Sequence, residues 1–140
     1  MRYQDIQQKI RPIFESDPEI AAVYLFGSTA TGKNHLKSDI DLAILFQRPL
    51  STIESHRRLE QHFVKLTKAL GAEPDLVDLE KIDLILLFEI LKEGIILIEN
   101  DRERNRNFMG RKLVECIDFQ TIMKRCARGM YRNALERVSG

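Results

Sequence analysis

The chain has 140 residues, of which 44% are hydrophobic and 31% are charged, and its formal net charge is +1. This length and apolar content fit a globular domain with a hydrophobic core and exclude a disordered chain. The near-neutral charge gives no electrostatic reason to expect binding to a nucleic acid or to a membrane surface.

The first hundred residues predict a mixture of helices and strands, because they contain both stretches with apolar residues at helical spacing and short continuous apolar runs. In chain order, the expected elements are a helix over 3–16, a strand over 20–26, a strand over 39–46, a helix over 51–70, a strand over 75–79, a helix over 83–92 and a strand over 95–98. Gly71 and Gly94 follow two of the helices and are expected to end them.

Residues 101–140 differ in character. Their pattern predicts a basic helical segment, broken near Asp118, with few apolar anchors per turn. It is either a surface for a partner or a solvated helix packed on its own domain, and the sequence leaves both open. We expect one domain over 1–140, with a core over about 1–100 and a helical extension over about 101–140.

The strand over 39–46 is unusual because it opens with two carboxylates, Asp39 and Asp41, before an apolar run. Side chains two residues apart in a strand point to the same face, so these carboxylates project side by side. Such a pair repels unless a cation lies between its members, and Mg²⁺ prefers oxygen ligands of this kind. The pattern therefore predicts a metal site.

Two interpretations of the turn before this strand compete. Residues 27–33 fit the P-loop spacing GxxxxGK, but Asn34 follows Lys33 where a P-loop needs Ser or Thr, and no long helix fits before residue 39. The alternative pattern is Gly27-Ser28, then ten residues, then Asp39-x-Asp41, between two apolar strands.

This second pattern resembles the signature of the DNA polymerase β-like nucleotidyltransferase superfamily. The short chain is similar to the minimal nucleotidyltransferases (MNT), the MntA-type antitoxins of HEPN/MNT toxin–antitoxin pairs, and the element order fits from about residue 5 to residue 100. The resemblance implies an α/β (α+β) fold with a small mixed β-sheet. Helices would pack mainly on one face, the nucleotide would lie on the other, and a long helical segment would end the chain.

The resemblance also implies the site residues. Asp39 and Asp41 would bind two Mg²⁺ ions together with a third carboxylate from a neighbouring strand. Asp75 and Asp78 are the two candidates, and they face opposite ways because they are three residues apart. We favour Asp75, which begins its strand as Asp39 does, and expect Asp78 to be a surface residue or a helix cap.

The triphosphate would lie against the turn, where Gly27 admits a close backbone approach and Ser28 and Lys33 contact the phosphates. The resemblance implies transfer of AMP from ATP to a tyrosine hydroxyl of a cognate HEPN ribonuclease toxin in a hetero-oligomer, which silences the toxin. The alternatives are a non-catalytic antitoxin that acts by steric complex formation and a small-molecule nucleotidyltransferase. No signal peptide or long apolar run is present, so we expect a soluble cytoplasmic protein without direct nucleic-acid binding.

Overall fold

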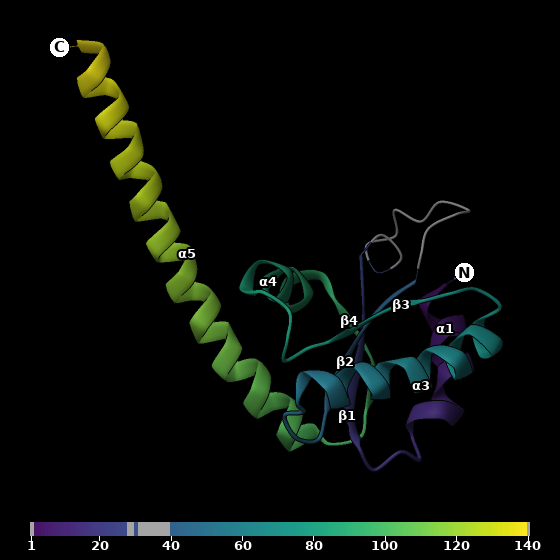
Figure 1. The fold of residues 1–140 in the computed structure, drawn as a ribbon. Helices are drawn as coiled ribbons and strands as arrows, with labels where there is room; N and C mark the ends of the chain where they lie inside the picture. Colours follow the sequence, from purple (N-terminus) through teal and green to yellow (C-terminus); the bar gives the residue numbers. More distant parts are fainter. Residues whose placement is uncertain (1, 28–29, 31–39, 140) are drawn as a thin grey trace.

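The computed structural model describes residues 2–27, 30 and 40–139. Its elements follow the predicted order (Figure 1). They are α1 (Tyr3–Phe14), β1 (Ile20–Phe26), β2 (Asp41–Phe46), α3 (Thr52–Leu70), β3 (Asp75–Asp78), α4 (Leu84–Glu93), β4 (Ile95–Glu99) and α5 (Arg102–Ser139).

Local signals set the bounds of the central helices. The hydroxyl of Ser51 accepts a hydrogen bond from the Glu54 N–H at 3.1 Å and caps α3 at its start. Gly71 ends the same helix in the left-handed region, with φ of 69°. The carboxylate of Asp83 caps α4 by accepting the Leu86 N–H at 2.8 Å.

The strands form a mixed sheet in the order β3-β2-β1-β4. β1 pairs antiparallel with both β2 and β4, whereas β2 and β3 are parallel. Among the described residues, β3 and β4 are therefore the edge strands, and β1 and β2 lie in the middle.

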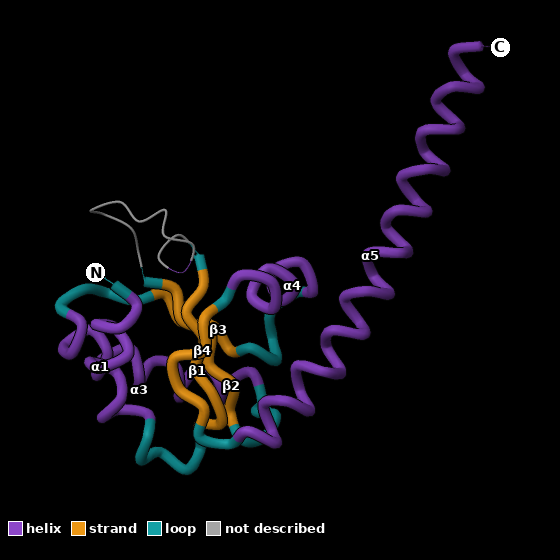
Figure 2. Tube along the Cα trace, turned by 180° about the vertical axis from the view of Figure 1, so that it is seen from behind, coloured by secondary structure: helices purple, strands orange, loops and turns teal. Residues whose placement is uncertain are grey.

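Helices cover both faces of this sheet. On one face, α1 and α3 pack against alternate strand residues such as Leu25 and Leu42. On the other face, α4 and the first turns of α5 pack against Tyr24, Ala43 and Leu45. The two helix pairs lie on opposite sides of the sheet in Figure 2. The expectation of helices mainly on one face, with the other left for the nucleotide, is wrong, because both faces of the central strands are apolar and require cover.

The last helix, α5, is continuous over 38 residues, so the break expected near Asp118 is absent. Its first turns are fixed to the core. The Tyr24 hydroxyl donates to Asn105 Oδ1 at 2.7 Å, and Phe108 and Cys116 are buried. Burial raises the pKa of Tyr24 to about 12. No residue from 121 to 138 is buried, and α5 extends away from the body of the molecule (Figure 1).

The exposed part of α5 is amphipathic rather than polar all round. Both cysteines of the chain lie on this helix as free thiols, of which Cys116 is buried and Cys126 is exposed. Large apolar side chains on the projecting part are also exposed: Ile122, Met123, Met130, Tyr131, Leu135 and Val138. None of the helices in the described part of the chain is long and apolar enough to cross a membrane.

Candidate active site

Two carboxylates lie side by side at one end of the sheet. Asp41 begins β2, Asp75 begins β3, and the two are register partners in the parallel pair. The Asp75 N–H donates to the Ile40 carbonyl at 2.8 Å and fixes this register. Neighbouring strands are about 4.8 Å apart and register partners share a face, so both side chains project in the same direction. The parallel pairing thus brings together residues separated by a whole helix.

The turn that follows β1 lies directly against this pair. Gly27 has φ of +75°, and a Cβ built on it would lie 2.2 Å from Asp41 Oδ2. Any larger side chain at this position would displace the carboxylate. Because Phe26 is the register partner of Asp41, the order across this end of the sheet is Gly27, Asp41, Asp75.

The structure gives Asp78 a different place. Its register partner is Ile44, and its side chain is only 5% exposed. It accepts hydrogen bonds from the Ser55 hydroxyl at 2.7 Å and from the Glu80 N–H at 3.0 Å. The sequence predicted that Asp78 is a surface residue or a helix cap, and the structure shows that it is neither. It joins β3 to α3, because a buried carboxylate needs such donors.

Three of the predicted site residues, Ser28, Lys33 and Asp39, lie outside the described residues. Within the described part of the chain, no three acidic, histidine or cysteine side chains group closely enough to hold a metal ion. The pair Asp41 and Asp75 still fits a hard cation, since it offers adjacent carboxylate oxygens beside a glycine that leaves space for them.

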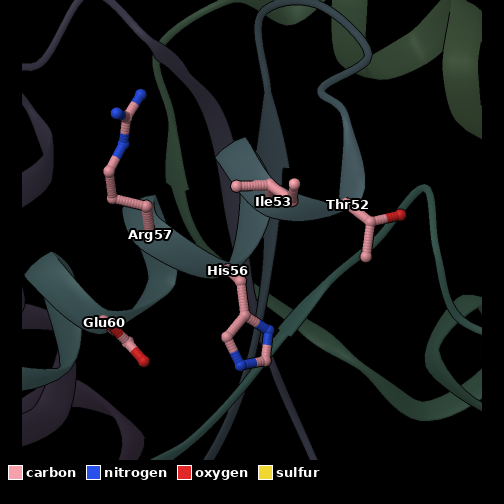
Figure 3. A pocket seen from close by; sticks show the side chains of 5 residues that line it. All are labelled: Thr52, Ile53, His56, Arg57 and Glu60. Carbon is pink, nitrogen blue, oxygen red and sulfur yellow. The ribbon is translucent and has the colours of Figure 1, made fainter.

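Shallow hollows continue from Asp75 along α3, and the sequence did not reveal them. The first, of about 260 Å³, is lined by His56, Leu59, Glu60, Phe63, Pro74, Asp75 and Leu76. The second, of about 230 Å³, follows β3 towards Ile82. The third, of about 370 Å³, lies on the outer surface of α3, where Figure 3 shows the side chains of His56, Arg57 and Glu60. His56 lines all three hollows. The sequence indicates this accessible position only through the place of His56 on the polar side of an amphipathic helix.

The other histidine of α3, His62, belongs to the core. Its ring centroid lies 5.1 Å from that of Phe14, and the side chain is almost fully buried. Burial lowers the pKa of His62, and the carboxylate of Asp17, 3.5 Å from Nε2, only partly opposes that shift.

Comparisons with known proteins agree with this geometry. The family model described as polymerase beta, nucleotidyltransferase matches residues 8–103. Protein adenylyltransferase MntA of Shewanella oneidensis is 35% identical over 85 residues, which are 61% of this chain and 58% of that protein. The match therefore covers little more than half of the relative's length.

Solved structures extend the likeness to nearly the whole chain. A toxin–antitoxin structure with AMP-PNP superposes with a TM-score of 0.67 at 25% identity and covers 93% of this chain and 98% of that chain. The complex of a tri-AMPylated HEPN toxin of Shewanella oneidensis with its MNT antitoxin gives a TM-score of 0.66 at 23% identity, with 91% and 98% covered, and shows a common fold.

The family match runs from α1 to the start of α5 and contains the turn at Gly27 and both paired carboxylates. The fold that brings these groups together is thus the one that the family shares. This chain belongs to the polymerase beta nucleotidyltransferase family.

Proposed function

We propose that this chain is a Mg²⁺-dependent protein adenylyltransferase that transfers AMP from ATP to a tyrosine hydroxyl of a cognate HEPN ribonuclease toxin and so neutralises it. The observation that carries the proposal is the register pair of Asp41 and Asp75 beside Gly27. The names of its relatives, an adenylyltransferase and a toxin–antitoxin structure with AMP-PNP, support the nucleotide and the class of acceptor.

The reaction forms a bond from the tyrosine oxygen to the α-phosphorus of ATP and breaks the bond from that phosphorus to pyrophosphate. Charge grows on the phosphate oxygens and on the leaving group, so positioning and electrostatic stabilisation supply most of the rate. Asp39, Asp41 and Asp75 would hold Mg²⁺, two ions when the site is full, and bound Mg²⁺ neutralises that charge.

The chain's own groups have separate tasks in this proposal. Gly27 lets the triphosphate approach the backbone and leaves the Asp41 carboxylate in place. Ser28 and Lys33 contact the phosphates. Asp75 begins an edge strand and is exposed, so an acceptor can reach it, and it takes the proton from the tyrosine hydroxyl.

A protein acceptor is supported by α5. The projecting half of this helix exposes several large apolar side chains. Exposed apolar surface of this kind is typical of a site that binds another protein. It is also basic, which disfavours pairing with a second copy of itself and favours an acidic partner surface. The charged residues from 118 onwards are Asp118, Lys124, Arg125, Arg128, Arg132, Glu136 and Arg137.

The test is intact-protein mass spectrometry of the toxin encoded beside this chain, after incubation with Mg²⁺ and ATP. We expect a mass increase in whole AMP units that Asp41→Asn abolishes. Asp83→Asn is the matched control, because asparagine also caps helices and Asp83 lies outside the site.

The alternatives predict other outcomes. An antitoxin that acts by steric blocking alone would still neutralise the toxin as the Asp41→Asn variant, with the toxin mass unchanged throughout. A small-molecule nucleotidyltransferase would leave the toxin unmodified and would adenylylate a compound such as an aminoglycoside instead.

A further inference from the structure

The sheet has an open edge next to its carboxylate pair. β3 bonds to β2 on one side only, and the described residues hold no strand on its other side. The N–H groups of Asp75 and Leu79 donate to Ile40 and Ile44 on the β2 side. Strand alternation then turns the backbone groups of Leu76 away from β2, towards solvent. Leu76 therefore offers an N–H and a carbonyl to an additional strand.

The hollows along α3 flank this open edge. The first lies beside Pro74, Asp75 and Leu76, and the second lies beside Val77 and Asp78. Both share His56 and Leu59 on the helix side, so together they form one groove between α3 and β3. The helical part of the lining, residues 52–63, rises by about 16 Å at 1.5 Å per residue, which matches roughly five residues of extended chain.

The order of groups across the site indicates which reactant enters on this side. In the proposed function, the triphosphate lies at the turn of Gly27. Attacking and leaving oxygens lie roughly in line on opposite sides of the transferred phosphorus. With the sequence Gly27, Asp41, Asp75 across the sheet end, pyrophosphate leaves on the glycine side and the acceptor arrives on the Asp75 side, where the groove begins.

We infer that the groove between α3 and β3 binds an extended segment of the acceptor protein, which adds to the sheet as a strand next to β3 and presents its tyrosine beside Asp75. This inference rests on the proposed function. Peptide addition to an open sheet edge derives affinity from main-chain hydrogen bonds and specificity from pockets for alternate side chains.

Register assigns a role to each side chain of such a segment. The residue opposite Asp75 would project to the same face as Asp41 and Asp75, so its hydroxyl lies in a row with the two carboxylates. Its two neighbours would project to the α3 face, into the hollow that contains His56, Leu59 and Phe63. The side chain of Glu60 also borders this hollow, so a neighbour with an apolar stem and a cationic end, Lys or Arg, fits best.

The first experiment reverses the charge of the groove. Glu60→Lys should raise the KM for the acceptor protein at least about tenfold, with the Kd for AMP-PNP unchanged. Glu15→Lys makes the same change of charge at the C-terminal cap of α1, at the opposite end of β1 from Gly27, and should leave both constants unaltered. An acceptor KM that is the same in both variants would overturn the inference.

Two further measurements require only the complex of this chain with the acceptor protein, so they also test strand addition if no AMP is transferred. A photo-crosslinking amino acid in place of His56 should capture the acceptor within a few residues of a tyrosine, and one in place of Gln61, outside the hollows, should not. Exchange of the Leu76 amide should slow at least about tenfold when the acceptor binds. Capture of a remote segment, no capture, or unchanged Leu76 exchange in the complex would refute strand addition. Loss of transfer in the wild type, with capture and protection intact, would refute only the proposed function.

Discussion

Replacing Gly27 by alanine should lower the activity about a hundredfold at a small cost in stability. An alanine Cβ would lie 2.2 Å from Asp41 Oδ2, about 1 Å inside ordinary contact, so the carboxylate must move by roughly that amount. A displacement of about 1 Å in a catalytic site lowers the rate by on the order of a hundredfold. The left-handed backbone, at φ of +75°, adds a cost of about 1–2 kcal/mol for any residue with a Cβ.

Gly71 provides a matched control for the backbone cost. Its φ is +69°, and a Cβ there would meet nothing within 4 Å. Both Gly27→Ala and Gly71→Ala should therefore lower the urea midpoint by roughly 0.5–1 M, at about 2 kcal/mol per molar urea. Only Gly27→Ala should lower the rate of AMP transfer, measured by intact-protein mass spectrometry at a temperature where both variants are folded. Equal loss of activity in the two variants would show that strain, not contact with Asp41, is responsible.

Other predictions separate structural from catalytic groups. Asp75→Asn should abolish AMP transfer with little change in the urea midpoint, whereas Asp78→Asn should cost about 1–3 kcal/mol of stability and leave the Kd for AMP-PNP unchanged. Burial lowers the pKa of His62, so its imidazole binds a proton more tightly in the unfolded chain than in the folded one. The contribution of neutral His62 to the free energy of unfolding is therefore complete above pH 6.5 and is lost as the pH falls through the folded-state pKa. Urea titrations at several pH values should show this loss, at most about 1.4 kcal/mol per pH unit, and His62→Phe should reduce it. Deleting residues 121–140 should leave the urea midpoint unchanged and weaken binding of the toxin in calorimetry, because no residue from 121 to 138 is buried.

Each of these has a clear contrary outcome. A stable Asp78→Asn variant without nucleotide binding would return Asp78 to the site. A pH profile that His62→Phe leaves unaltered would assign the acid sensitivity to other groups. Undiminished toxin binding after the deletion would place the interface on the body of the molecule.

Patterns within single segments were sufficient to predict most of the fold. The strand at 20–26 is a continuous apolar run, and the helix that ends at Leu70 has Ser51 and Gly71 at its limits, so both appear as predicted. The helices on the second face of the sheet were not predicted, although the apolar pattern of the strands indicated them. Strands without polar alternation, such as β1, are buried on both sides.

Most of what local patterns could not predict depends on contacts between distant segments. The sequence suggested the pairing of Asp75 with Asp41 only through a family resemblance, because their register is set by the β2–β3 ladder. The burial of Asp78 follows from Ser55, 23 residues earlier, and no local pattern links the two. The break expected near Asp118 is absent because an aspartate lowers helix propensity too little to end a long helix.

Because half of α5 is exposed to solvent, the lifetime of this chain in the cell should depend on whether a partner protein covers that helix. A helical stretch of this length without tertiary packing is marginally stable in water and opens far more often than the core. Proteases cut such transiently opened termini, whereas a partner that covers the apolar side chains holds the backbone closed. Free copies should therefore be degraded faster than assembled ones, so that the cellular amount of this protein follows the amount of its partner.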